Sequence, residues 1–183
     1  MSRVVGMGRP RAFDEAEAIR RAAVLFAERG YDGTSVDDLV QGLGVHRGSL
    51  YKVFGSKRGL YLAALRHHLE DEVLPTVAAL TVTSGPAEAL AQAAGGFDGG
   101  AAAGLLLSAA VHQAPTDPDV AALVEEALRA LERALAAVLG EPADSPLIGA
   151  LGASVLGLRL RDRAFGPAAS APAVHALAVR LAD

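Results

Sequence analysis

The amino-acid sequence predicts an all-α fold, in which a short N-terminal helical unit precedes a longer helical region. Three observations support this prediction. Apolar residues recur at three- and four-residue intervals along most of the chain, as they do on the buried face of an amphipathic helix. Gly and Pro fall between the periodic segments, where helices end or begin. Residues 34–57 contain two short periodic segments joined by a glycine-bearing turn, which is the layout of a helix-turn-helix.

The composition suits a globular chain with a sizeable core, because 51% of the 183 residues are hydrophobic. There is no cysteine, which excludes disulfides and thiolate zinc sites and suits the cytoplasmic location that we expect. The N-terminus lacks the layout of a signal peptide. No uninterrupted apolar run reaches about 18 residues, so we expect no membrane span.

The net charge of −4 conceals an uneven distribution. Residues 1–68 contain 11 Lys and Arg against 7 Asp and Glu, a net charge of +4, whereas the other 115 residues contain 6 against 14, a net charge of −8. The basic section coincides with the helix-turn-helix, as attraction to phosphates would require. Chance unevenness remains an equal alternative on charge alone.

The arm at residues 1–9 and the residues just after it carry Arg3, Arg9 and Arg11. Such an arm either reaches into a minor groove of DNA or is solvated. We favour the solvated state for Arg3, and both alternatives remain open for the other two.

The first helix is predicted over residues 14–29. Asp14 is a suitable N-cap, and Glu17 stands three residues later in a capping-box relation. Gly30 ends the helix. The expected apolar face consists of Ala16, Ile19, Ala23 and Phe26.

The second helix is expected to begin after Ser35, with Asp38 near its amino end. Gly44 is predicted to have a positive φ, because a tight turn into a new helix requires a left-handed residue. Val45 should then fill the core between the two helices. The expected buried side of the second helix consists of Val36, Leu39, Val40 and Leu43.

The third helix, over residues 46–53, separates by spacing into two faces. Leu50 and Phe54 are four residues apart and should point inward. The other face carries cationic and phenolic groups and a glycine that permits close approach, which suits phosphates and base edges. Its members are Arg47, Gly48, Tyr51 and Lys52, with Ser49 at the margin. His46 at the helix start either contacts a phosphate or is a partly exposed structural histidine, the alternative that we favour.

A fourth helix should start after the Ser56 cap. Lys57 and Arg58 fall in its first turn, where cations oppose the helix dipole. Their placement is favourable if the helix start faces a phosphate. We expect that role for Lys57 and assign none to Arg58.

Residues 10–65 resemble the DNA-binding domain of the TetR family of transcriptional regulators. The matching segments are AVLFAERGYDGTSVDDL and GLGVHRGSLYKVFGSKRGLYLAAL. The departures are Leu39-Val40, where an Ile-Ala pair is common, and His46, where Ser or Asn is common. The resemblance implies a homodimer of about nine helices per subunit, with a DNA-binding domain at 10–55 and a ligand-binding and dimerisation domain at 56–183. The DNA-contacting positions that it implies are Ser35, Arg47, Ser49, Tyr51, Lys52 and Lys57.

The longer region should contain six further helical segments. The fourth helix should end or kink at Pro75, after Leu74. His68 and Glu72 on it could share a metal, although a solvated linker helix is the better account. The other segments are predicted at residues 87–94, 105–113, 117–139, 145–165 and 172–182.

The last two helices are predicted to form a homodimer. The helix at 145–165 is apolar on more than one face, and a helix of that kind must be buried on both sides. The helix at 172–182 carries Val174, Leu177, Ala178 and Leu181 in heptad-like spacing. Burial within one subunit is the alternative. Any cavity in the longer region would be lined mainly by aliphatic side chains, which suits a small lipophilic effector, with His112 and Gln113 as weak candidates for its polar groups.

The function that these observations favour is a ligand-responsive repressor that binds palindromic double-stranded DNA as a dimer. A transcriptional activator, or a co-regulator of the same fold without a small-molecule ligand, is the alternative. We find no catalytic constellation, no metal site and no cofactor motif, which argues against a helical-bundle enzyme. A protein-interaction module with a basic face for an acidic partner is the third class considered.

Overall fold

The computed structural model describes residues 14–166 and 169–182, and in this part of the chain the regular secondary structure is all helical, without strands. The all-α prediction is therefore confirmed. The N-terminal arm with Arg3, Arg9 and Arg11 lies outside the described residues. The elements are α1 (Glu15–Arg29), α2 (Val36–Leu43), α3 (Arg47–Phe54), α4 (Lys57–His68), a π-helical turn η1 (Leu69–Val73), α5 (Leu74–Leu80), α6 (Pro86–Gly96), α7 (Leu105–His112), α8 (Pro118–Leu139), α9 (Pro146–Phe165) and α10 (Ala171–Ala182).

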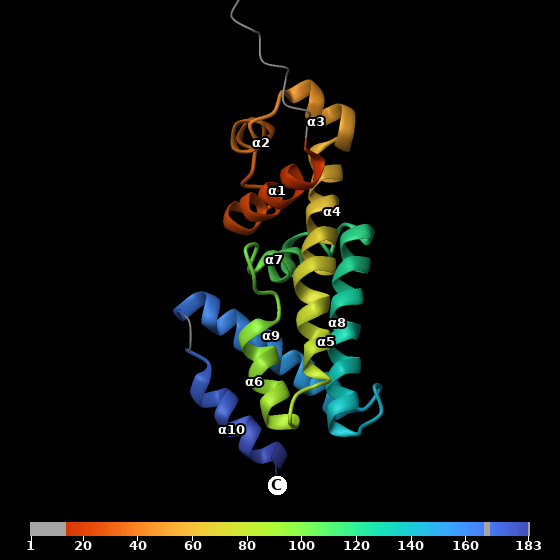
Figure 1. Cartoon of the computed structure of the whole chain (residues 1–183). Coiled ribbons are helices and arrows are strands. Elements are labelled where there is room, and N and C mark those ends of the chain that lie inside the picture. The colour runs from red at the N-terminus through yellow and green to blue at the C-terminus, as the bar shows by residue number, and fades with distance from the viewer. Residues whose placement is uncertain (1–13, 167–168, 183) are drawn as a thin grey trace, which may run out of the picture.

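One long helix runs through the molecule, because α4, η1 and α5 follow each other without a break from residue 57 to residue 80. Counted in this way, the described residues form nine separate helical segments, the number that the resemblance implies. Figure 1 shows α1, α2 and α3 gathered at one end of the molecule, with α6, α9 and α10 toward the other. The long helix packs against α1 near its start and against α8 near its end.

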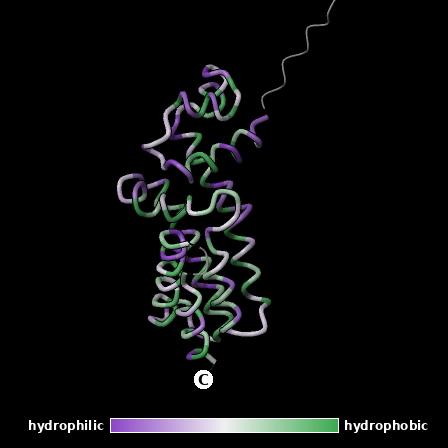
Figure 2. Tube along the Cα trace, turned by 90° about the vertical axis from the view of Figure 1, so that its left-hand side faces the viewer, coloured by the Kyte–Doolittle hydropathy of each residue, from purple (hydrophilic) through white to green (hydrophobic). Residues whose placement is uncertain are grey.

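A single hydrophobic core extends from α1 to α9, so the two predicted domains share a continuous set of buried side chains. Hydrophobic and hydrophilic residues alternate along the helices in Figure 2, as expected for helices with one apolar side. None of the helices in the described ranges combines the length and hydrophobicity that a membrane span requires.

The first helix confirms its predicted N-cap at Asp14 and its end at Gly30, but not all of its predicted apolar face. Asp14 Oδ1 accepts a hydrogen bond from the Glu17 N–H at 3.0 Å, and Gly30 follows the last turn. The Glu17 carboxylate binds Arg20 and Arg21 at 2.7 and 2.9 Å. Ala16 is exposed, which contradicts the prediction. The helix presents a neighbouring stripe inward, so that Ala18, Ala22, Ala23, Phe26 and Ala27 are buried.

The long helix continues past Pro75, so of the two predicted outcomes, an end or a kink, the end is excluded. In a regular α-helix the proline ring would clash with the carbonyl group of Asp71, four residues earlier. Here the preceding residues form a π-helical turn, in which the Leu74 N–H donates to the Leu69 carbonyl oxygen. The wider turn relieves the clash, and Pro75 occupies the first turn of α5, where its missing N–H is tolerated.

His68 is buried, although a solvated linker helix was expected at this point. Its Nε2 lies 2.8 Å from Asp98 Oδ1, and neither side chain is exposed. The Asp98 carboxylate also accepts hydrogen bonds from the N–H groups of Leu106 and Leu107, at 3.1 and 2.9 Å. The pair therefore ties the end of α4 to the first turn of α7. The described residues contain no group of three His, Cys, Asp or Glu side chains arranged for a metal.

Candidate nucleic-acid interface

The turn between α2 and α3 is built by local hydrogen bonds and one left-handed glycine. The Ser35 side chain accepts from the Asp38 N–H, and the Asp38 carboxylate accepts from the Ser35 N–H, which completes a capping box at the start of α2. Gly44 has φ 67° and ψ 33°, as predicted, and Val45 packs against the core. These contacts set the angle at which α3 leaves the domain.

Helix α3 shows the two faces that its spacing predicts. Leu50 is fully buried, and Phe54 packs against the core. Tyr51 is 41% exposed, and Arg47, Gly48 and Lys52 are exposed as well, while Ser49 is half-buried. Helix α3 lies at the end of the molecule farthest from the C-terminus (Figure 1). Its polar face is thus available to an extended partner.

Two further residues belong to this exposed face or its edge. His46 is the N-cap residue of α3, is exposed and makes no side-chain capping hydrogen bond. Val53 is 39% exposed, which the spacing did not predict. An added Cβ at Gly48 would meet no atom within 4 Å, so this position leaves open space in front of the helix. The exposed face therefore has no bulky side chain at this position.

Arg47 is held by a partner that sequence reasoning missed. Its Nη2 lies 2.5 Å from Asp37 Oδ1 at the start of α2, and both side chains are more than half exposed. The Asp37 carboxylate raises the pKa of the guanidinium, which stays charged in any case. The contact spans ten residues across the turn, so no helical spacing signals it. The ion pair connects the start of α3 to the start of α2.

Ser35 and Lys57 have roles inside the domain. The Ser35 hydroxyl donates to Asp38, which lowers the pKa of that carboxyl, together with the Ser35 N–H and the nearby Arg29. The Lys57 ammonium donates to the carbonyl oxygens of Tyr31 and Thr34, at 3.0 and 3.1 Å. It also lies 4.1 Å from the centre of the Tyr31 ring. A phosphate contact by either residue stays a prediction.

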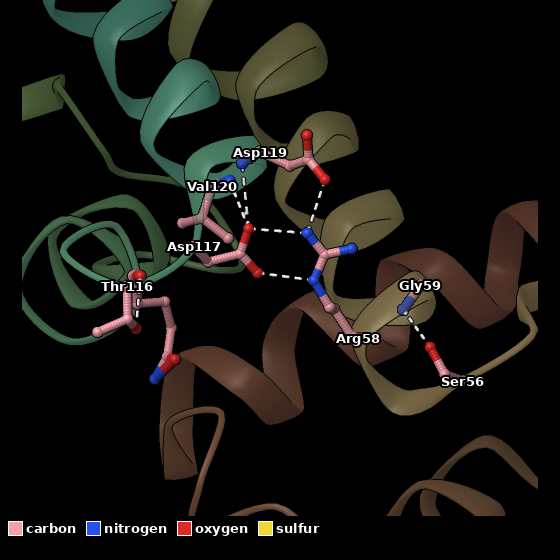
Figure 3. Close-up of polar contacts among 8 residues, drawn as sticks. Ser56, Arg58, Gly59, Thr116, Asp117, Asp119 and Val120 are labelled. Atoms are coloured by element: carbon pink, nitrogen blue, oxygen red, sulfur yellow. Dashed lines mark hydrogen bonds and ion pairs between the residues drawn. The ribbon is translucent and has the colours of Figure 1, made fainter.

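Arg58 connects the interface to the rest of the molecule, although the sequence assigned it no role. Figure 3 shows its guanidinium between two carboxylates at the start of α8. Nε and Nη2 donate to the two oxygens of Asp117 at 2.7 and 2.8 Å, and Nη2 also donates to Asp119 at 2.6 Å. Asp117 caps α8 as well, by accepting from the N–H groups of Asp119 and Val120. The first turn of α4 is therefore fixed to the first turn of α8.

Replacing Asp117 with Asn tests this connection, because Asn keeps a capping oxygen and loses the charge. Hydrogen bonds from Arg58 are the main reason that the pKa of Asp117 lies below its ordinary value. A lowered folded-state pKa stabilises the fold above the unfolded pKa of about 3.9, and this contribution is lost as pH falls through the folded value. We expect Asp117→Asn to lower the melting temperature at pH 7 and to match the wild type in acid.

Thermal melts from neutral pH down to about pH 2 measure this difference. The matched control is Glu125→Gln, which breaks an exposed pair with Arg129 on the same helix and should change the melts little. A deficit of Asp117→Asn that persisted unchanged in acid would show that capping, and not charge, is responsible.

The two candidate effector-binding residues lie elsewhere than expected. His112 is exposed at the end of α7, and Gln113 Nε2 donates to Asp32 at 3.3 Å. Neither residue lines the cavity of about 670 Å³ between α6, α9 and α10. The prediction was based on helix position alone and did not anticipate that the end of α7 faces the N-terminal helices.

Comparison with known proteins agrees with this geometry. Residues 18–64 match the family model of the bacterial regulatory proteins of the tetR family. A relative from Bacillus subtilis, the uncharacterized HTH-type transcriptional regulator YezE, is 35% identical over 137 residues, which are 70% of this chain and 69% of that protein. The transcriptional repressor BdcR from Escherichia coli is 43% identical over 68 residues, but these span only 34% of its length.

Solved structures extend the likeness to the whole chain. The TetR family regulator CifR, solved as a cysteine mutant in complex with a 26 bp double-strand operator DNA, is 25% identical, with a TM-score of 0.70 over 95% of this chain and 97% of that one. A transcriptional regulator from Rhodococcus gives a TM-score of 0.74 at 25% identity, over 92% and 95% of the two chains. The fold, the helix-turn-helix and the extent of the match to YezE lead to one conclusion: this chain belongs to the TetR family of DNA-binding transcriptional regulators.

Proposed function

We propose that this protein is a repressor that binds a palindromic operator as a homodimer, with the two α3 helices in successive major grooves. In such an arrangement the recognition helices lie about 34–36 Å apart. The proposal rests on the two faces of α3. Leu50 is fully buried on one face, whereas Tyr51 and Lys52 are exposed on another. Repression is supported by BdcR, a named repressor to which the N-terminal region is similar.

The proposed division of labour follows the two regions predicted from the sequence. Residues 10–55 would bind DNA and residues 56–183 would regulate and dimerise. The proposed DNA contacts are Ser35, His46, Arg47, Gly48, Ser49, Tyr51, Lys52 and Lys57. Acting on chromosomal DNA, such a regulator would work in the bacterial cytoplasm.

Apolar side chains left exposed on α9 and α10 support a dimer through these two helices. Leu160 and Phe165 are 59% and 79% exposed, and Leu147 and Val179 also face outward. Gly149 and Gly157 have open space around them, which would let another helix approach. Leu177 and Leu181 of the α10 stripe pack against the subunit's own core, which agrees with the alternative of burial within one subunit for this part of the stripe. The proposed partner surface therefore comes mainly from α9.

A small lipophilic effector completes the proposal, because aliphatic side chains line most of the cavity between α6, α9 and α10. A ligand that favours a different spacing of the α3 helices would weaken operator binding, typically by about 5- to 150-fold. An activator, or a co-regulator without an effector, would share the DNA-binding surface. A reporter gene placed downstream of the operator separates repression from activation.

Selection of bound sites from random duplex DNA tests the proposal. We expect an enriched palindrome whose half-site centres lie about one helical turn apart. Sedimentation of the free protein should give twice the chain mass of 18.7 kDa. A monomeric protein, or bound sequences without twofold symmetry, would contradict the dimeric model, and the absence of any enriched sequence would contradict sequence-specific binding.

A further inference from the structure

The cavity between α6, α9 and α10 has a mixed lining that narrows the chemistry of its ligand. Its volume of about 670 Å³ falls in the range of small-molecule sites. Much of the wall is alanine, and the described lining contains no Phe, Tyr or Trp, so the apolar part suits an aliphatic chain. The apolar lining residues are Ala91, Ala94, Ala103, Leu107, Ala171, Val174 and Ala178.

Two guanidinium groups from α9 line the same cavity. Arg159 Nη1 donates to the carbonyl oxygens of Ala94 and Gly95, at 3.4 and 2.9 Å. Within the described ranges, Arg163 donates to the carbonyl oxygens of Ala103 and Ala27, at 2.8 and 2.9 Å. Among the described residues no carboxylate forms an ion pair with either arginine. Both cations are therefore held by neutral acceptors, which leave their charge uncompensated.

Arg159 also has a polar atom without a partner. Its Nε is buried and makes no hydrogen bond with any described residue. A buried donor of a charged group that stays unpaired is costly, and an ionised oxygen is the acceptor that satisfies a guanidinium best. Arg159 is half-buried and Arg163 is more exposed, so an anion between them would remain reachable from solvent.

The acidic residues of the lining are already satisfied by other donors. Asp98 is fully buried and accepts from His68 and from two N–H groups of α7. Asp162 Oδ1 accepts from the Ser170 N–H at 2.8 Å. His175, on α10, is exposed at the cavity. Neither guanidinium forms an ion pair with these carboxylates, and Asp162, which accepts only from a backbone N–H, is the acidic group of the lining that likewise has no ion-pair partner among the described residues.

We propose that this cavity binds an amphiphilic anion, with an aliphatic chain against the alanine wall and a carboxylate or phosphate head group between Arg159 and Arg163. The inference rests on the proposed function, because it specifies the effector as a charged molecule where composition alone suggested a lipophilic one. The polar residues of this proposed site also differ from those that the sequence suggested for the effector, because they lie on α9.

Arg163 also connects the cavity to the DNA-binding helices. Arg163 Nη2 donates to the carbonyl oxygen of Ala27, in the last turns of α1. Its Nη1 passes so close to Gly104 that an added Cβ would lie 1.8 Å away, so the glycine is what admits the guanidinium. An anion that draws Arg163 into the cavity competes with the Ala27 carbonyl and releases a contact between α9 and α1.

Calorimetric titration with matched eight-carbon probes tests the proposal. The probes are octanoate, octyl phosphate and octan-1-ol at pH 7, where both acids are ionised. We expect saturable binding of at least one anion, about tenfold or more tighter than the alcohol. Comparison of the two anions identifies which head group the site prefers. Equal binding of the alcohol and the anions, or no saturable binding at all, would overturn the proposal.

Variants locate the site. Arg159→Gln and Arg163→Gln should each weaken anion binding about tenfold or more, whereas Arg129→Gln, on the exposed side of α8, should not. Ala91→Leu keeps both charges and fills part of the cavity, so it should weaken binding even if an arginine variant does not fold. Circular dichroism identifies the folded variants. Unchanged anion binding in folded Arg159→Gln and in Ala91→Leu would overturn the assignment.

The effect of the anions on operator binding distinguishes a failure of this inference from a failure of the proposed function. Octanoate or octyl phosphate should weaken operator binding by the wild type and have less effect on Arg163→Gln, which lacks the contact with Ala27. If the protein binds an operator selectively but does not bind the anions, this inference is wrong and the proposed function stands. If the protein binds the anions saturably but selects no operator, the anion site stands and the proposed function is wrong.

Discussion

Replacing Tyr51 with Ala is expected to weaken operator binding by about 30-fold or more. A contact with a base edge contributes about 1–3 kcal/mol, and a dimer loses it twice, so the total loss is about 2–6 kcal/mol. The change should not disturb the fold, because Tyr51 is 41% exposed and Leu50 beside it supplies the buried contact of α3. Tyr51→Ala therefore separates DNA recognition from stability.

Footprinting or fluorescence anisotropy on a selected operator measures the effect. Lys52→Ala is the companion variant, since a lost phosphate contact should also flatten the dependence of log affinity on log salt by about one unit per subunit. Arg129→Ala removes an exposed cation on α8, far along the chain from α3, and should leave affinity unchanged. Operator affinity that stays the same in both α3 variants would show that another surface meets the DNA.

Phe26→Ala is expected to have the largest effect on stability, with a loss of about 3–5 kcal/mol. Phe26 is fully buried, and its ring meets Tyr61 of α4 edge-on at 5.0 Å and Tyr31 at 6.2 Å. The aromatic cluster joins α1 to the long helix, and Lys57 covers it from the Tyr31 side. Since domains are stable by only about 5–15 kcal/mol, the variant should be close to unfolding at growth temperatures.

Chemical denaturation of Phe26→Ala and of Val82→Ala provides the comparison. Val82 is 84% exposed in the loop after α5, so its truncation should cost less than about 0.5 kcal/mol. A loss in Phe26→Ala no greater than that of Val82→Ala would mean that the aromatic cluster is not what holds α1 on α4.

Local signals explain why the helix boundaries could be predicted. Asp14, Ser35 and Ser56 cap their helices through side-chain hydrogen bonds to backbone N–H groups three residues later, and such contacts depend only on nearby residues. Gly44 was predictable for the same reason, since the turn itself requires a left-handed residue. The recognition face followed from spacing along eight residues of α3.

Contacts between distant residues explain what the sequence did not reveal. Arg58 pairs with Asp117, 59 positions away, and His68 with Asp98, 30 positions away. No periodicity links such pairs. The buried His68 could not be told from a solvated one, because its partner lies in a glycine-rich loop whose course is set by tertiary packing. The position of the cavity depends on how α6 meets α9 and α10, which the pattern of each helix leaves open.

The wider turn at Leu69–Val73 separates the long helix into two halves that are oriented independently. Such a turn holds about one residue more than an α-helical turn, so the side chains of α5 are rotated by roughly 100° from the directions that an unbroken α-helix would give them. The α4 half can therefore be matched to α1 while the α5 half is matched to α8.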